Sequence, residues 1–180
     1  RALDNSDPTY AVSAAVYGAS LLTLYAASTL YHSAKKPKLR NRLNIFDHAA
    51  IYILIAGTYT PFCLITLAGK VGWILFACVW AFAVAGVILK LFFTGRYDKL
   101  STLMYVFMGC MVIFAFKPLM AHLPTEGLYW LLGGGLSYII GAAFYSFPQH
   151  IRYNHAIFHV FVLAGSLCHF VSVYYYVISP

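Results

Sequence analysis

Four ionisable residues stand at the ends of long apolar runs in this sequence. His32 closes one run, Asp47 opens the next, and His155 and His159 open the last. Ionisable side chains in or beside hydrocarbon are costly, so they usually persist because they bind or react with something. Two imidazoles four residues apart on one helix, with a third imidazole and a carboxylate from elsewhere, indicate a metal site with an open coordination position.

The helical spacing of the last two histidines suits a single metal ion. On a helix, His155 and His159 are about 6 Å apart along the axis and about 40° apart around it. Ser28 has the same relation to His32, one helical turn earlier. The sequence therefore offers His32, His155 and His159 as metal ligands, with Ser28 close to the first of them.

Two other histidines are weaker candidates for the same site. His48 adjoins Asp47 but points about 100° away from it on a helix, so we rank it below His32 as a ligand. His169 is about 21 Å along its helix from His155, which is too far to bind the same metal. We expect His169 to be a buried polar residue with a partner of its own.

The composition is that of a membrane protein. The chain is 62% hydrophobic and 9% charged, and its mean hydropathy is +0.76, whereas soluble domains carry about 25% charged residues. The net charge of +7 is explained by membrane topology and lipid headgroups. No basic stripe alternates with exposed aromatic residues as a nucleic-acid groove requires, so we expect no nucleic-acid partner.

The apolar runs predict an all-α, polytopic transmembrane helix bundle in a single domain, residues 1–180. Each run is close to the roughly 20 residues that a bilayer requires, and the links between them are short, which implies antiparallel neighbours. The predicted spans are about 9–33, 45–67, 71–93, 100–119, 127–147 and 155–178. The cysteines form no CxxC pair and are predicted to be buried packing residues: Cys63, Cys78, Cys110 and Cys168.

Counting hairpins places the metal candidates at one face of the membrane. The first span ends at His32, the second begins at Asp47, and each later pair of spans returns to that side before His155. Most of the 12 Lys and Arg residues lie there too, namely Lys35, Lys36, Lys38, Arg40, Arg42, Lys90, Arg96, Lys99 and Arg152, against Arg1, Lys70 and Lys117 on the other side. The positive-inside rule makes the more basic side cytoplasmic, and it explains the run from Lys35 to Arg42 as an anchor.

Each candidate residue also has a plain structural interpretation. A single histidine in a membrane helix can be a packing residue with a satisfied hydrogen bond, and Ser28 can simply pack against a neighbouring helix. Asp47 can cap its helix, because a carboxylate suits a helix N-terminus. The placement of His32, Asp47 and the His155/His159 pair on one face favours a metal site over separate structural roles.

Several segments resemble the haemolysin III family, part of the progestin and adipoQ receptor superfamily, which is related to the alkaline ceramidases. The similarity extends over nearly the whole chain, and the order of an SxxxH motif, an aspartate and an HxxxH motif is specific to this group. The segments that carry it are Ser28–His32, Phe46–Tyr52, Ala56–Phe62, Lys90–Gly95, His155–His159 and Gly165–Phe170.

The resemblance implies a zinc site in a bacterial plasma membrane. It implies Zn²⁺ bound by His32, His155 and His159, with Asp47 engaging the water on the metal and Ser28 close by. It also implies seven helices, a cytoplasmic N-terminus and an external C-terminus. Six spans are visible here, and an even number leaves both ends outside, so we expect the family's first helix to precede Arg1.

Two classes of function follow from these features. The favoured one is a zinc-dependent hydrolase of acyl amide or ester lipids in membrane lipid homeostasis, in which zinc lowers the pKa of a water to about 7. Asp47 would take the proton, and Ser28 or zinc would stabilise the oxyanion. The alternative is non-enzymatic, either a cytolytic pore or a sensor of membrane state with structural zinc. The partners are then membrane lipids, and a pore would also need oligomerisation because the spans show no channel-lining polar stripe.

The charge distribution predicts the orientation of two links. If the positive-inside rule sets the topology, the link from Lys35 to Asn44 is cytoplasmic and the link from Ala121 to Glu126 is external. We expect an impermeant thiol reagent to label Thr125→Cys but not Lys38→Cys in intact cells, in a background lacking the four native cysteines. Labelling of Lys38→Cys from outside would overturn the orientation.

Overall fold

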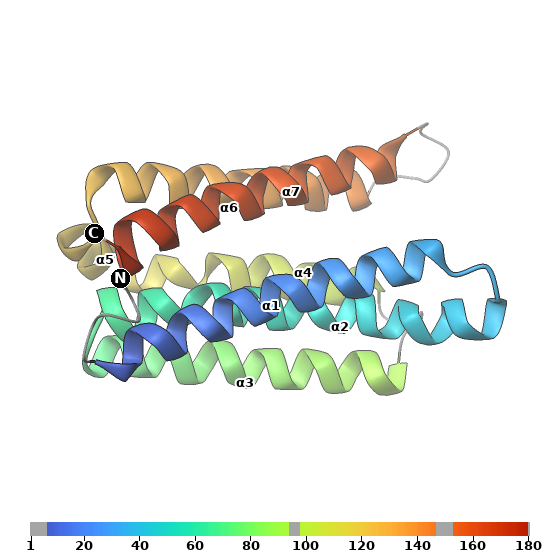
Figure 1. The fold of residues 1–180 in the computed structure, drawn as a ribbon, viewed down its shortest axis with the longest axis horizontal. Coiled ribbons are helices and arrows are strands. Elements are labelled where there is room, and N and C mark those ends of the chain that lie inside the picture. Colours follow the sequence, from blue (N-terminus) through green and yellow to red (C-terminus); the bar gives the residue numbers. More distant parts are fainter. Residues whose placement is uncertain (1–6, 94–97, 147–152, 180) are drawn as a thin grey trace.

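The chain folds into a bundle of helices that run roughly antiparallel to one another (Figure 1). The structure is a computed structural model, and it describes residues 7–93, 98–146 and 153–179. Over those ranges there is no strand, and six helices are long and apolar enough to cross a membrane. The prediction of an all-α transmembrane bundle is therefore confirmed.

The six candidate spans contain seven α-helices and three short irregular segments. The helices are α1 (Pro8–Ser33), α2 (Pro37–Pro61), α3 (Lys70–Phe93), α4 (Asp98–Cys110), α5 (Phe116–His122), α6 (Thr125–Ser146) and α7 (Asn154–Val173). A π-helical segment extends α2 and another extends α7, and a 3₁₀ segment joins α4 to α5; they are Phe62–Thr66, Tyr174–Ile178 and Met111–Ala115.

Helices α1 and α2 both begin with a proline, and α2 begins earlier than the apolar pattern suggests. Pro is well suited to the first helical position, because its missing N–H would have no partner there. Asp7 caps α1, with its carboxylate accepting a hydrogen bond from the Thr9 N–H at 2.8 Å. Hydrogen bonds from Thr9 lower the pKa of Asp7. The polar residues 37–44, expected to be a link, are instead the first two turns of α2.

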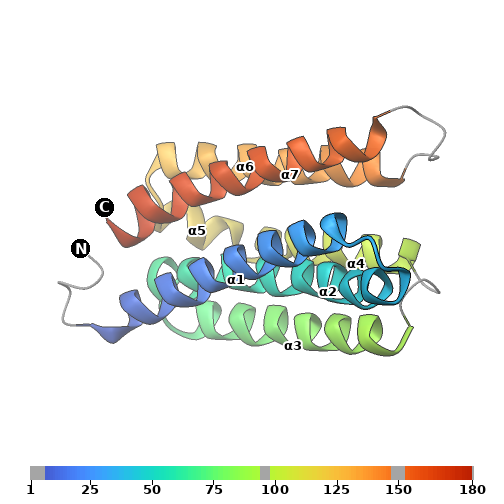
Figure 2. The ribbon, with the colours of Figure 1, turned by 45° about the vertical axis from the view of Figure 1, so that its right-hand side comes forward.

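The helices form two groups (Figures 1 and 2). In one group α1 packs along α2, and α2 packs along α3; in the other, α6 packs along α7. Helix α4 makes contacts with both groups. The backbones of α1 and α7 approach each other closely at few positions. The ends of the helices near the α1–α2 connection, which we call the basic end, also include the start of α7 (Figure 1).

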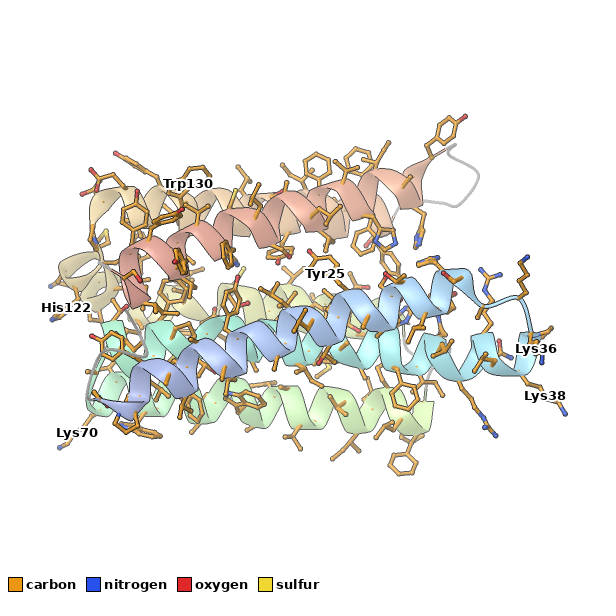
Figure 3. The ribbon with its side chains drawn as sticks, in the orientation of Figure 1. Tyr25, Lys36, Lys38, Lys70, His122 and Trp130 are labelled. Atoms are coloured by element: carbon orange, nitrogen blue, oxygen red, sulfur yellow. The ribbon has the colours of Figure 1, made fainter. Side chains whose placement is uncertain are left out.

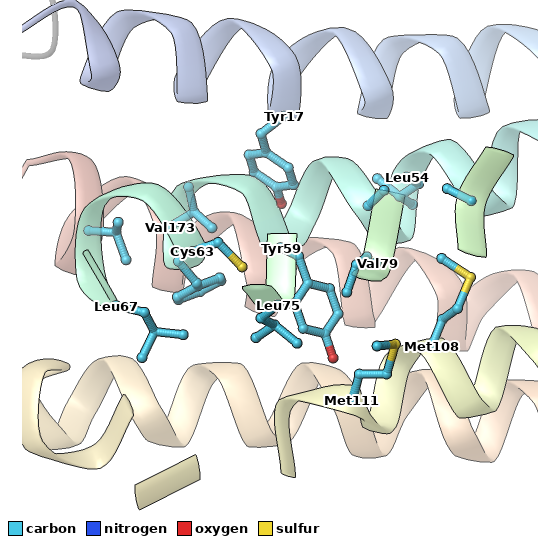
Figure 4. Close-up of a cluster of buried hydrophobic side chains, with 14 of the residues drawn as sticks. Tyr17, Leu54, Tyr59, Cys63, Leu67, Leu75, Val79, Met108, Met111 and Val173 are labelled. Carbon is cyan, nitrogen blue, oxygen red and sulfur yellow. The ribbon is translucent and has the colours of Figure 1, made fainter. Parts of the chain in front are cut away.

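The hydrophobic core is centred on α2, the most buried of the six spans. Side chains from α2 and its π-helical extension, α3, α4 and α7 meet there, among them Tyr59, Cys63, Val79, Met108 and Val173 (Figure 4). The outer surface is also apolar, since Phe114 is 81% exposed and Leu22 is 74% exposed. Apolar side chains both inside and outside are what a bilayer-embedded bundle requires.

The cysteines match their predicted packing role only in part. Cys63 is buried, Cys110 and Cys168 are half-buried, and Cys78 is exposed; all four are free thiols. The prediction is wrong for Cys78, because an apolar run shows only that a segment is in the membrane and not which of its faces meets lipid.

Tyr59 supports the point where the fourth span changes from α-helix to 3₁₀-helix. Its hydroxyl donates to the carbonyl of Gly109 at 2.8 Å and accepts from the N–H of Val112 at 2.8 Å. Backbone groups without partners are costly in hydrocarbon, where no water replaces a lost helical bond. One buried side chain thus satisfies both backbone groups at this irregular point.

Three glycines spaced seven residues apart let α6 approach α7 closely. A Cβ atom at Gly127, Gly134 or Gly141 would meet Tyr176, His169 or Phe161, respectively. Small residues serve the same purpose between membrane helices in general. Side chains then cross the narrow interface to backbone carbonyls: Ser137 to Phe161 at 2.9 Å, His169 to Leu131 at 3.1 Å and Ser172 to Gly127 at 2.8 Å.

The glycine at position 134 gives a test of this packing. Gly134→Ala should lower the free energy of unfolding by about 1–3 kcal/mol, because the methyl group would collide with the His169 ring. Gly133→Ala is the matched control, since a Cβ there meets nothing within 4 Å. Thermal unfolding in detergent would measure both variants, and equal effects would contradict the proposed interface.

Candidate metal centre

Three histidines from two helices converge at the basic end. His32 lies in the last turn of α1, and His155 and His159 lie in the first two turns of α7. The Nε2 atom of His155 is 3.4 Å from that of His32 and 3.1 Å from that of His159. One ligand atom from each of the three residues lies within 4.8 Å of the other two. The structure thus brings together the three residues that the sequence predicts as ligands.

Hydrogen bonding alone does not account for this arrangement. A ring nitrogen carries either one hydrogen or one lone pair, so it can form one good hydrogen bond in its ring plane. Nε2 of His155 can therefore form a hydrogen bond with the Nε2 of either His32 or His159, but not with both. The other close nitrogen–nitrogen contact is then not a hydrogen bond. A cation between the three rings would satisfy all three lone pairs at once.

The spacing also fits the size of a zinc ion. Two nitrogens bound to zinc at 2.0–2.1 Å in a tetrahedral arrangement are about 3.3 Å apart. The two separations at His155, 3.4 and 3.1 Å, agree with that value, and the nitrogens of His32 and His159 lie within 4.8 Å of each other. Three neutral imidazoles are a common ligand set for zinc with one open position. His32 and His155 are exposed and His159 is half-buried, so the centre lies at an accessible part of the bundle.

Asp47 and Ser28 lie beside the three imidazoles. The half-buried Asp47 carboxylate interacts with the Ser28 hydroxyl and, through space, with His48, His32 and His155. Asp47 does not belong to the group of ligand atoms that lie within 4.8 Å of one another. All five residues selected from the sequence are thus in one region, with a carboxylate near the imidazoles but outside their cluster.

His48 has a larger role in this region than its sequence position suggests. Its Nδ1–H donates to the carbonyl of Asn44 at 2.8 Å, which leaves Nε2 of the neutral ring to accept from the Tyr145 hydroxyl at 3.2 Å. Tyr105 on α4 donates to the backbone carbonyl of His48 at 2.9 Å. His48 therefore joins α2, which carries Asp47, to α6 and α4.

Tyr145 continues this connection to the metal candidates on α7. Its ring centre is 5.1 Å from that of Phe158. The Phe158 ring is in turn 5.9 Å from His155 and 5.0 Å from His159. This series of contacts fixes the α7 imidazoles relative to α2. The sequence places Tyr145 and His48 at the same end of the bundle, but gives no signal that they meet.

His169 is separate from the centre, as predicted. It is buried, its Nε2–H donates to the carbonyl of Leu131 at 3.1 Å, and its ring packs on Tyr138 at 5.2 Å. The prediction of a buried polar residue with its own partner is confirmed.

Comparison with known proteins identifies the family of this chain. The sequence model of the family described as haemolysin-III related matches residues 2–170. The chain belongs to the haemolysin III family. It is 50% identical to Hemolysin-3 of Bacillus cereus over 163 residues, 91% of this chain and 74% of that protein. It is 46% identical to the Hemolysin-3 homolog of Bacillus subtilis (strain 168), covering 93% of this chain and 78% of the relative.

A human protein is similar to this chain at lower identity. Monocyte to macrophage differentiation factor of Homo sapiens is 30% identical over 177 residues, which cover 92% of this chain and 70% of the human protein. Family membership and six helices of membrane-spanning length together make this chain an integral membrane protein. The resemblance inferred from its motifs is therefore confirmed.

The geometry predicts one zinc ion per chain. Loss of a residue that only hydrogen-bonds to a zinc ligand weakens metal binding about 10- to 100-fold. Loss of a ligand itself should have a larger effect, so His32→Ala or His159→Ala should weaken zinc binding by more than about 100-fold. His122→Ala is the control, because His122 is exposed and its Nδ1 bonds to Pro118 in its own helix. Metal analysis of unchelated protein and anomalous scattering at the zinc edge would measure this. A metal at His169, or none, would contradict the site.

Proposed function

We propose that this haemolysin III protein is a zinc-dependent hydrolase of acyl amide or ester lipids, acting in membrane lipid homeostasis at the plasma membrane. One observation carries the proposal: three imidazoles with the geometry of a zinc site adjoin a carboxylate and a hydroxyl. A purely structural zinc is normally closed by four protein ligands, whereas three ligands leave a position for chemistry.

An apolar groove between α1 and α7 supports a lipid substrate. It has a volume of about 300 Å³ and is open along one side. Leu21, Leu22 and Tyr25 line it from α1, and from α7 it is lined by Leu163, Ser166, Leu167 and Phe170. Tyr25 precedes His32 by about 10 Å along α1, and Leu163 follows His159 by about 6 Å along α7, so the groove begins about one to two turns from the imidazoles.

The groove and the centre together suit an acyl chain attached to a carbonyl. The chain would lie in the groove between α1 and α7, where its methylene groups contact leucines. Its carbonyl would then be near His32 and His159. These residues lie on the faces of α1 and α7 that line the groove, closer to the basic end. A substrate could enter sideways from the bilayer, because Leu22, Leu163 and Leu167 are exposed on the outer surface.

The residues around the centre can move the proton that hydrolysis requires. Zinc, when bound, would lower the pKa of a water and polarise the acyl carbonyl. A carboxylate oxygen of Asp47 accepts the water's proton as the oxygen–carbon bond forms. Asp47 then gives that proton to the leaving nitrogen or oxygen as the carbon–heteroatom bond breaks. The Ser28 hydroxyl orients the carboxylate or donates to the acyl oxygen.

The names of the bacterial relatives support a second candidate function. One is called Hemolysin-3 and the other a Hemolysin-3 homolog, and the word hemolysin refers to lysis of blood cells. A cytolytic pore would not require a three-histidine centre beside a carboxylate, so the hydrolase accounts for more of this site. A sensor with structural zinc would use the same ligands but would show no turnover.

Hydrolysis can be tested with purified, reconstituted protein. We expect release of free fatty acid from acyl amide or ester lipids in vesicles, loss of release after chelation, and recovery with added zinc. Mass spectrometry of the lipids would measure it, and vesicles loaded with a soluble dye would report any pore at the same time. Dye release without fatty acid would overturn the hydrolase in favour of the pore.

Asp47 separates metal binding from chemistry. Asp47→Ala should keep most of the zinc, since Asp47 is outside the ligand cluster, and should lower the rate of hydrolysis at least about 100-fold, as loss of a general base does. Asp7→Asn is the matched control, because it removes an exposed carboxylate at the start of α1. Zinc content and initial rates would be measured in parallel. Complete loss of zinc in Asp47→Ala would argue against its role in proton transfer.

A further inference from the structure

We propose that five basic residues in the α1–α2 connection and the first turns of α2 form a phosphate-binding rim for an anionic lipid. We call them the basic rim: Lys35, Lys36, Lys38, Arg40 and Arg42. This inference rests on the proposed hydrolase and deepens it by naming its substrate class. That class is a phospholipid in which the headgroup phosphate lies one glycerol-sized unit from an acyl carbonyl.

The basic rim is exposed, and no carboxylate whose side chain the structure describes pairs with it. All five side chains are exposed, and Lys36 and Lys38 project from the tip of the α1–α2 connection (Figure 3). None of the five forms an ion pair within the ranges 7–93, 98–146 and 153–179. Among carboxylates whose side chains are described, Asp7 and Glu126 lie at the opposite end, and Asp47 alone is at this one.

The basic rim adjoins the metal centre in both sequence and space. It begins three residues after His32 and ends five residues before Asp47. Arg40 lies over the Tyr31 ring, with its guanidinium carbon 5.4 Å from the ring centre. The Tyr31 ring is itself 4.7 Å from the His32 ring. Only one aromatic ring therefore separates a guanidinium from a metal candidate.

Phosphate is the anion that this arrangement fits best. A guanidinium presents paired N–H donors that match two phosphate oxygens, and lysine ammonium groups add point charges. The contact with Tyr31 holds the Arg40 side chain near the site and so reduces the entropy lost on binding. A phosphate at the basic rim, a carbonyl at the imidazoles and an acyl chain in the α1–α7 groove would follow one another from the basic end toward the middle of the bundle.

The positive-inside rule explains the side on which these charges lie but not their concentration. The orientation of the protein in the membrane depends on how many Lys and Arg residues lie on each side of the membrane, and not on which short link holds them. Here a single segment, the one between His32 and Asp47, holds five of the nine basic residues predicted for this side. Arg96 and Arg152 belong to the other links and lie outside the described residues.

The proposal can be tested by lipid binding without turnover. The full-length protein, with zinc, would be reconstituted with photoactivatable phosphatidylglycerol or phosphatidylcholine that carry identical acyl chains. We expect the wild-type protein to be labelled more by phosphatidylglycerol. Arg40→Gln should lower the ratio of the two labelling yields about tenfold, the effect of one charge-assisted hydrogen-bonded contact. Lys70→Gln is the control, an exposed cation at the opposite end of the bundle.

The outcomes distinguish this inference from its alternatives. Equal labelling by the two lipids, or equal losses in Arg40→Gln and Lys70→Gln, would overturn the phosphate site. Displacement of the lipid label by millimolar glycerol phosphate would show a water-soluble phosphate ligand and overturn the lipid assignment. Headgroup preference without any hydrolysis would support the rim and reject the hydrolase, whereas hydrolysis that ignores the headgroup would do the reverse.

Discussion

The candidate metal centre depends on how two helix groups meet. Helices α6 and α7 are locked together by interfacial glycines and by hydrogen bonds from Ser137, His169 and Ser172 to backbone carbonyls. Helix α1 packs along α2 with similar closeness, since a Cβ at Gly57 would collide with Ser20. Between α1 and α7 few backbone atoms approach closely, so their relation depends on side chains such as the imidazoles of the centre. A cation there would add a cross-link between α1 and α7 to the contacts that already join the two groups through His48, Tyr145 and α4.

The membrane explains why the polar side chains are arranged as they are. In hydrocarbon each polar group needs a partner within the protein, and the tyrosine hydroxyls provide several of them. Tyr59 satisfies the irregular turn of the fourth span, and Tyr105 and Tyr145 hold His48 on either side. These bonds hold α2 near its middle, at His48, and near its C-terminal end, at Tyr59. Asp47 is thus presented by the best-held helix of the bundle, as a group that must act at a defined position requires.

Much of the fold and centre followed from sequence because each depends on one-dimensional spacing. The lengths of the spans, together with the alternating direction of successive spans, place His32, Asp47 and His155 at one end of the bundle. Helical periodicity places His159 beside His155. Other features depend on how helices are rotated about their axes, which composition does not determine. The exposure of Cys78 and the meeting of His48 with Tyr145 are of this kind. The early start of α2 at Pro37 was missed for another reason: hydropathy marks the bilayer, whereas helices can continue beyond it.

The order of features along α1 gives the proposed substrate a direction. From the groove residues Leu21 and Tyr25 the helix leads to Ser28, then to His32, and on into the basic rim. Apolar, reactive and cationic sections thus succeed one another in the same order as the chain, carbonyl and phosphate of a membrane phospholipid. A lipid in its bilayer orientation could therefore occupy all three sections without turning over, provided that the basic end faces the leaflet from which it comes. Such a fit requires α1 and α7 to separate enough for the chain to lie between them, and the sparse contact between these helices would permit that movement.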